Sequence, residues 1–284
     1  MLIDVKAREV FHFTLLRRLA ERFPDGLRLK GGVNLRLFFG SVRYSEDMDL
    51  DADPRLQPRL AEQLRKIIDS PEYRRELLLL GIDEVTSSAE IAKKTDTTLR
   101  FKVMVVKGGV QLPTKVEISF RDTTPAEWAV RETPPASVLV QAFPGTVPTF
   151  EVAHYPHKIA VWQKVNALAT RGGVQARDIF DLDWLFNVER FGNPSDALLQ
   201  FLRNEHPLAN LEKARDRCVE INDDQFNTQV GAYLEPAIFA QHASRWDEMR
   251  LRVHGILSKA IARTPSETPN DPTPPEHTKN RRTR

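Results

Sequence analysis

The chain has 284 residues, of which 41% are hydrophobic and 28% are charged, and its formal net charge is only +2. The length allows one large domain or two modest ones, with enough apolar residues to bury a core. The near balance of charge gives no indication by itself of nucleic-acid binding, although a local basic surface stays open.

Three further features concern the compartment. Cys218 is the only cysteine, so no internal disulfide can form and the chain fits a reducing compartment. The N-terminus carries charges throughout and lacks the apolar segment of a signal peptide. No apolar run approaches the roughly 18 residues of a transmembrane helix. We therefore expect a cytoplasmic protein that does not enter a membrane.

The N-terminal half mixes helical and extended patterns. Residues 4–22 have the periodicity of an amphipathic helix, and acids alternate with apolar residues over 47–52, as in a strand with one buried face. The other expected elements are a strand at 27–30, a short helix at 33–40, helices within 57–80 interrupted at Ser70-Pro71, and strands at 97–106 and 115–120 joined by a GGVQLP connection.

The C-terminal half is mostly helical. Residues 122–150 are rich in Pro and Thr, and we expect loop and short strands there. The tail at 264–284 has five prolines and almost no apolar residues, so we expect disorder. Helical patterns cover 155–171, 176–186, 194–205 and parts of 207–221 and 231–262. The predicted organisation is a mixed α/β domain over 1–150, a helical domain over 151–263 and the tail.

A row of acids stands out, because Asp47, Asp49, Asp51 and Asp53 fall on every second residue. A strand projects alternate residues to one face, so neighbouring carboxylates would lie about 7 Å apart. Carboxylates this close repel one another unless a positive charge lies between them, and Mg²⁺ prefers such hard oxygen ligands. The alternative is a solvated edge strand. We expect Asp51 and Asp53 to lie outside the metal site.

A second strand favours the metal site. In KVEISF, Lys115, Glu117 and Ser119 share one face. If this strand neighbours the acid row, Glu117 would stand beside Asp47 and Asp49. Two acids from one strand and one from another can hold two metal ions about 3.5–4 Å apart for phosphoryl chemistry. Taken alone, an acid on an amphipathic strand is more often simply exposed.

Residues upstream of the acids suit a phosphate. The pair Gly31-Gly32 precedes a helix, where the backbone can approach a ligand and free N–H groups attract phosphate. Arg43 and Ser45 share the face of the acids on the same alternation. Ser45 would donate to a phosphate oxygen or cap the strand end. Arg43 would bind phosphate or pair with Asp51.

Two cations share one stripe of the helix expected at 155–171. Lys164 and Arg171 stand seven positions apart on a largely apolar stripe and should meet an anion, for which a triphosphate would serve. The alternative is a salt bridge within the chain, to Asp178 or Asp181. Both can hold, because an Asp181–Lys164 pair would be able to aim the ammonium at phosphate.

Three segments carry motifs in a fixed order: LKGGVNLRLFFGSVRYSEDMDL, KVEIS and KVNALATRGGVQARDIFDLDWL. They resemble the AbiEii/AbiGii nucleotidyltransferase toxins of bacterial abortive-infection and toxin–antitoxin systems, a branch of the superfamily that includes DNA polymerase beta. The resemblance covers about residues 27–51, 115–119 and 158–185. The matching positions are Lys30, Gly31, Gly32, Arg43, Ser45, Asp47, Asp49, Glu117, Lys164, Ala167, Leu168, Arg171, Arg177, Asp178, Asp181 and Leu182.

The resemblance implies an α/β (α+β) fold, with a nucleotidyltransferase-type mixed sheet flanked by helices and followed by a C-terminal helical bundle. It implies a toxin that transfers a nucleoside monophosphate from an NTP to an RNA, for example the 3′ end of a tRNA, with Mg²⁺. A cognate antitoxin would be encoded nearby. Two alternatives stay open: an antibiotic-modifying nucleotidyltransferase of small molecules, and a non-catalytic binding protein that retains the fold.

Each candidate residue then has an expected role. Asp47, Asp49 and Glu117 would hold Mg²⁺, and Glu117 would help to deprotonate the acceptor hydroxyl. Lys164 and Asp181 would complete the catalytic set, with Asp181 favoured over Asp178. The expected nucleotide-binding residues are Gly31, Gly32, Arg43, Ser45, Lys164 and Arg171.

Overall fold

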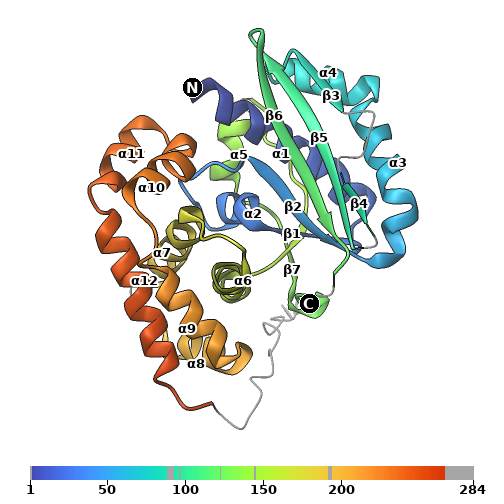
Figure 1. The fold of residues 1–284 in the computed structure, drawn as a ribbon. Helices are drawn as coiled ribbons and strands as arrows, with labels where there is room; N and C mark the ends of the chain where they lie inside the picture. The colour runs from blue at the N-terminus through green and yellow to red at the C-terminus, as the bar shows by residue number, and fades with distance from the viewer. Residues whose placement is uncertain are drawn as a thin grey trace, which may run out of the picture.

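The computed structural model describes residues 2–87, 93–95, 97–121, 123–143, 145–190 and 194–265. It contains a mixed sheet flanked by helices and followed by a group of C-terminal helices (Figure 1). This architecture confirms the predicted α/β fold class. The tail expected to be disordered lies outside the described residues, apart from its first two positions.

The sheet is centred on the strand that carries the acids. Its strands are β1 (Leu27–Lys30), β2 (Asp47–Ala52), β3 (Glu84–Ser87), β4 (Lys93–Thr95), β5 (Thr98–Lys107), β6 (Val110–Ser119), β7 (Val130–Glu132) and β8 (Val152–His154). Their order is β3-β5-β6-β2-β1-β8-β7, and β4 pairs with β5 off this path. Strand β2 runs antiparallel to β1 and parallel to β6, which itself runs antiparallel to β5.

Helices precede, interrupt and follow the sheet. They are α1 (Leu2–Arg22), α2 (Gly31–Phe38), α3 (Gln57–Ile68), α4 (Pro71–Leu79), α5 (Ala136–Ala142), α6 (His157–Thr170), α7 (Ala176–Arg190), α8 (Asp196–Glu205), α9 (Leu208–Arg217), α10 (Asp223–Gln229), α11 (Pro236–Ala243) and α12 (Trp246–Ile261). Local sequence sets some of their ends, since Ser70 caps α4 and Asn222 forms a capping box with Gln225 at α10. Within the described part of the chain, no helix is both long and apolar enough to span a membrane.

Apolar side chains form two clusters. The first contains residues of α1 and of one sheet face, for example Phe11 and Ile118. The second joins Leu35 of α2 to the C-terminal helices, for example Leu182 and Leu257. Figure 1 shows α6 beside the sheet, with the orange and red helices beyond it. The predicted division of the chain near residue 150 stays a prediction.

The structure differs from three sequence expectations. The helix predicted at 33–40 begins at Gly31, so the Gly pair forms its first turn. The connection predicted over GGVQLP is shorter than expected. Only Gly108 and Gly109 form the turn between β5 and β6, because Val110–Ser119 is extended throughout, including Pro113. Residues 136–142 form helix α5, because Leu139 and Ala142 are buried against the first apolar cluster. Tertiary burial outweighs the Pro-rich local pattern there.

Acid should weaken the fold through His12, which is buried and shares a 2.8 Å hydrogen bond with Thr114. Burial, aided by the charge of Arg8, lowers the pKa of His12 to about 3, from 6.5. Between these values the unfolded chain binds a proton that the folded chain excludes. Stability should therefore fall as the pH falls through this window, by up to about 1.4 kcal/mol per pH unit.

The matched variant is His12→Gln, whose amide can still reach Thr114 and does not titrate. Denaturant unfolding of both proteins between pH 7.5 and pH 4 gives the difference in unfolding free energy at each pH, which isolates His12 from other groups. The wild type should lose stability relative to the variant on acidification. A constant difference would show that His12 titrates alike in both states.

Candidate active site

The sheet register brings the predicted acids together. Asp49 of β2 lies directly opposite Glu117 of β6, and Asp47 lies opposite Lys115. On the other side of β2, Lys30 of β1 lies opposite Asp49. Met48 and Leu50 point to the apolar core, so the acids project from the other face. The register thus confirms that Glu117 stands beside the acid row.

Cations of the chain itself neutralise two of these acids. Lys115 Nζ donates to Asp47 Oδ2 at 3.0 Å, and Arg100 Nε donates to Glu117 Oε2 at 2.6 Å. The second oxygen of Asp47 is buried and has no hydrogen-bond partner among the described residues. Burial raises the pKa of both Asp47 and Asp49. The site therefore holds carboxylate oxygens that lack full compensation.

These carboxylate oxygens are of the kind that binds a divalent cation, although in the structure they do not converge on one point. No group of three acidic, His or Cys side chains in the described ranges is close enough to hold a metal ion. The hard oxygens of Asp47 and Asp49, one of them unpaired and buried, are the ligands that Mg²⁺ prefers. Glu117 would join them only after Arg100 moves aside.

Asp51 and Asp53 lie outside these contacts and have other partners. Asp51 is buried, accepts from Lys30 Nζ at 2.5 Å and accepts from the Tyr155 hydroxyl at 2.9 Å. Asp53 binds Arg55 in the turn that follows the strand. Asp51 is therefore the residue that holds Lys30 in place beside Asp49.

The Gly pair is required by the acids and by Ser45. Gly31 has φ +68°, and a Cβ there would lie 2.4 Å from Asp49 Oδ2. A Cβ on Gly32 would lie 2.7 Å from Ser45 Oγ. Ser45 itself donates to the carbonyl of Asp47 at 2.7 Å, so its hydroxyl fixes the start of the strand. Side chains at either glycine would displace the residues that shape the site.

Gly31→Ala should therefore damage the site more than the fold. The positive φ costs about 1–3 kcal/mol in any residue with a Cβ. Displacing the Asp49 carboxylate should lower the rate of nucleotidyl transfer, the activity that the resemblance implies, about a hundredfold. Gly40→Ala is the matched control, because Gly40 has φ +61° and nothing within 4 Å of its Cβ position. Both variants should lose similar stability in denaturant unfolding. Equal transfer rates would contradict this role of Gly31.

On the other side of the site, charges alternate through a buried network. Lys164 Nζ lies 2.6 Å from Asp181 Oδ2 and 3.1 Å from Asp178 Oδ1. Arg171 lies 2.8 Å from Asp178, and Arg43 holds Asp181 through two hydrogen bonds of 2.9 and 2.8 Å. Both aspartates are fully buried. Three cations thus face two carboxylates, which leaves one positive charge in excess.

Electrostatics hold Asp181 ionised. Burial alone would raise its pKa, but Arg43 and Lys164 outweigh that effect and lower the pKa to about 2. Arg43 is committed to Asp181 and to the carbonyl of Tyr44. The alternative pairing of Arg43 with Asp51 is wrong. The predicted salt bridge of Lys164 is present, and it involves both Asp178 and Asp181.

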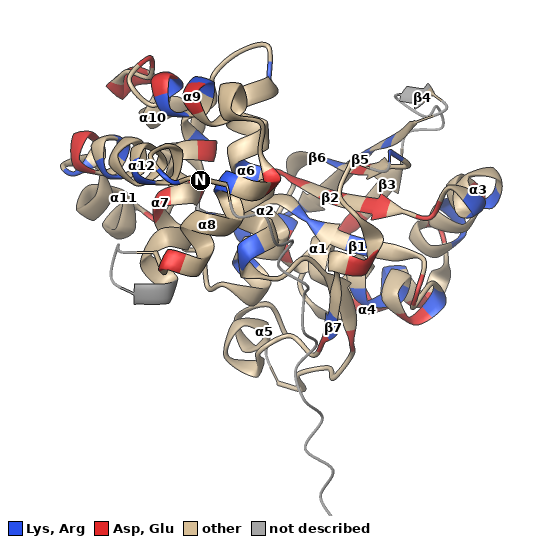
Figure 2. Ribbon diagram, turned by 90° about the horizontal axis from the view of Figure 1, so that it is seen from below, with Lys and Arg blue, Asp and Glu red and all other residues tan. Residues whose placement is uncertain are grey.

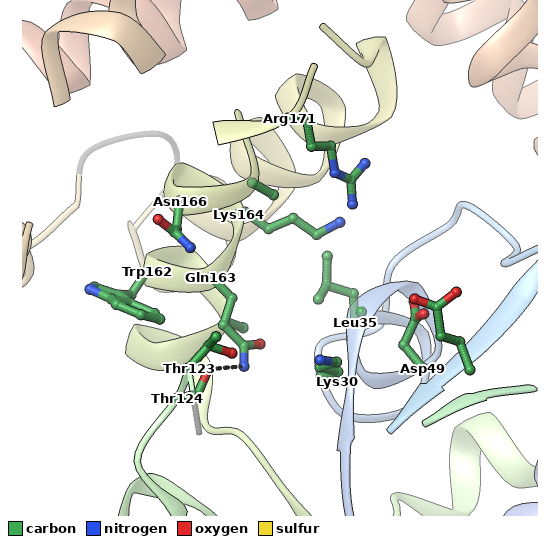
Figure 3. Close-up of a pocket in the computed structure, with 14 residues that line it drawn as sticks. Lys30, Leu35, Asp49, Thr123, Thr124, Trp162, Gln163, Lys164, Asn166 and Arg171 are labelled. Carbon is green, nitrogen blue, oxygen red and sulfur yellow. Dashed lines mark hydrogen bonds between the residues drawn. The ribbon is translucent and has the colours of Figure 1, made fainter. Parts of the chain in front are cut away.

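A pocket of about 240 Å³ lies between the acids and helix α6 (Figure 3). Lys164 and Arg171 project from α6 toward the side where Asp49 lies. Five of the predicted site residues line the pocket: Gly31, Asp49, Glu117, Lys164 and Arg171. The others, Gly32, Arg43, Ser45, Asp47 and Asp181, support these residues from outside the lining. We call this space the nucleotide pocket, after the ligand that the resemblance implies.

The pocket also contains residues that the sequence interpretation left out of the site. Gln163 donates to Thr124 at 3.1 Å, which fixes its amide in the wall. Trp162 and Asn166 complete the same wall, and Lys30 closes the opposite side. Gln163 lies four positions before Ala167, which also lines the pocket, so helical spacing from that motif residue would have indicated it, whereas no local signal marks Thr124.

Comparisons with known proteins identify the family of the chain. Residues 14–252 match the family described as "Nucleotidyl transferase AbiEii toxin, Type IV TA system". No curated protein matches the chain. Two solved structures are similar. One is described as a candidate nucleotidyltransferase from H. pylori, with 17% identity, a TM-score of 0.48, and coverage of 90% of this chain and 96% of that one. The other is JHP933 from Helicobacter pylori, with 18% identity, a TM-score of 0.47, and coverage of 89% and 94%.

Because the family match spans most of the sequence and confirms the predicted resemblance, the chain belongs to the AbiEii nucleotidyltransferase toxin family.

Proposed function

We propose that this protein transfers a nucleoside monophosphate from an NTP to a hydroxyl of an RNA acceptor, such as the 3′ end of a tRNA. The observation that carries the proposal is the nucleotide pocket, where Asp49 and Glu117 face Lys164 and Arg171. Carboxylates on one wall suit metal ions, and cations on the other suit a triphosphate. The toxin family supports a partner antitoxin as well.

Asp47 and Asp49 would hold Mg²⁺, and Glu117 would contribute to a second ion. When bound, the metal would neutralise charge on the phosphates and lower the pKa of the acceptor hydroxyl. The chain's own residues do the positioning. Lys164 and Arg171 bind the triphosphate, and the buried carboxylates of the network fix their direction.

Arg100 has a switching role in this proposal. Its guanidinium pairs with Glu117 in the structure, and the side chains of both are partly exposed. When Arg100 turns away, Glu117 is free to accept the proton of the acceptor hydroxyl. Catalysis therefore relies on orientation and charge, without a covalent protein intermediate.

The decisive experiment incubates the protein with each α-labelled NTP, Mg²⁺ and total RNA. Label should enter RNA, and chelation of Mg²⁺ should stop the transfer. Label in a small molecule such as an aminoglycoside, with none in RNA, would favour the antibiotic-modifying alternative. No transfer from any NTP to RNA, protein or small molecules would overturn the enzymatic proposal and favour a binding protein that retains the fold.

A further inference from the structure

A second pocket, of about 460 Å³, adjoins the acid row. Along the paired strands β2 and β6, the lining passes from Asp49 and Glu117 in the nucleotide pocket to Asp47 and Lys115 in this one. The acid row therefore separates two hollows on one sheet face. The second pocket is lined by Glu46, Asp47, Thr86, Ser87, Lys102, Val103, Met104, Pro113, Thr114 and Lys115.

The second pocket combines an apolar surface with two adjacent cations. Met104 and Pro113 are cross-strand neighbours, and so are Lys102 and Lys115. Like charges directly opposite each other destabilise a sheet. Lys115 is balanced by Asp47, whereas Lys102 is exposed and forms no ion pair with any residue that the structure describes. Figure 2 shows basic and acidic positions side by side across these strands. An anion from outside would balance Lys102.

The proposed reaction also requires a site for the acceptor, on the side of the acids away from Lys164 and Arg171. The acceptor oxygen forms a bond to the α-phosphorus and loses its proton to Glu117, as in the proposed function. The bond from the α-phosphorus to the bridging oxygen breaks, and pyrophosphate leaves with the electron pair. Attacking and leaving oxygens lie roughly in line. With the triphosphate on Lys164 and Arg171, the acceptor enters from across the acids, where the second pocket lies.

Building on the proposed function, we infer that the second pocket binds the terminal nucleotide of a single-stranded RNA acceptor. Lys102 and Lys115 bind the phosphate before the reacting nucleotide, and its ribose and base lie on Met104 and Pro113. This directs the terminal hydroxyl toward Asp47. An unpaired strand fits, because its base is free to contact apolar side chains. The charge of Lys102, which Asp47 does not balance, and the position of the pocket beside the acids favour RNA over a protein segment.

Lys102→Gln tests the inference, because this exposed residue lies outside the proposed catalytic set. Binding of a short fluorescein-labelled single-stranded RNA, measured by anisotropy, should weaken about tenfold when one charged contact is lost. The slope of log K against log salt should decrease by about 0.7, as expected for one phosphate contact with a single strand. Lys107→Gln, on the same strand but outside the pocket lining, should change neither quantity.

Kinetics separate this inference from the proposed function. In Lys102→Gln, the KM for the RNA acceptor should rise about tenfold, while the KM for the NTP stays unchanged. If both variants transfer nucleotide and bind RNA like the wild type, the proposed function stands and the inference is overturned, leaving this face to a protein partner. If no transfer occurs at all, the proposed function fails, and the anisotropy experiment still decides whether RNA binds at Lys102.

Discussion

Asp49→Asn is expected to remove nucleotidyl transfer almost completely, lowering kcat/KM for the NTP about a thousandfold. Asp49 lines the nucleotide pocket directly opposite Glu117. The substitution keeps the shape of the side chain but removes its negative charge, so a proposed Mg²⁺ ligand is lost. Transfer of label to RNA over a series of NTP concentrations measures the change.

Stability should not fall with the activity of this variant. Burial raises the pKa of Asp49, which means that the fold disfavours its charged form. The neutral amide should therefore leave the free energy of unfolding unchanged or higher. Asp53→Asn is the matched control, because Asp53 belongs to the same row but binds Arg55 in a turn. Wild-type transfer by Asp49→Asn, or a loss shared by Asp53→Asn, would refute the site.

Asp181→Asn is expected to lower the free energy of unfolding by about 3–5 kcal/mol, the usual cost of removing one partner of a buried ion pair. Arg43 would lose its only carboxylate among the described residues, and its side chain is only 5% exposed. Lys164 would keep Asp178. Denaturant unfolding near pH 7 measures the loss. Transfer should also weaken, because Lys164 is held less firmly.

The matched control lies two residues further along α7. Asp183 also binds an arginine through two hydrogen bonds, of 2.6 and 3.0 Å, but its partner Arg252 is partly exposed. Burial raises the pKa of Asp183, whereas Arg43 and Lys164 lower that of Asp181 to about 2. Asp183→Asn should therefore cost much less. Equal losses in both variants would show that the network does not stabilise Asp181 specifically.

The pH dependence of the same group has a definite sign. The folded pKa of Asp181 is about 2, below its ordinary value of 3.8. Its contribution is complete above the ordinary value and is lost as the pH falls toward 2. The stability difference between wild type and Asp181→Asn should accordingly shrink in that window.

Strand alternation was sufficient to predict one wall of the site. It placed Asp47 and Asp49 on one face of their strand and Glu117 on one face of its own, and the register shows that the two strands are neighbours. Period-two patterns determine side-chain direction directly, so a sequence carries that information. Helical periodicity predicted the stripe of Lys164 and Arg171 in a similar way, and both residues line the pocket.

Tertiary partners were not predictable in the same way. Arg43 and Asp181 are 138 positions apart, and only the packing of α7 near the sheet brings them together. The sequence offered Asp51 as a nearer partner for Arg43, but Lys30 and Tyr155 occupy it. The sequence likewise did not predict Arg100 and Lys115 as partners of the acids. These ion pairs depend on the register between neighbouring strands, which the local sequence pattern does not give.

The pairing of the acids with Lys115 and Arg100 has a consequence for folding. Two of the three proposed metal ligands, Asp47 and Glu117, already have a counter-ion from a neighbouring strand. At these two residues, the proposed metal binding would exchange one cation for another instead of neutralising a bare carboxylate. Unlike a domain that folds around its zinc, this chain can reach its native state before any ion arrives. Assembly and activation thereby become separate events, and the second can be controlled without undoing the first.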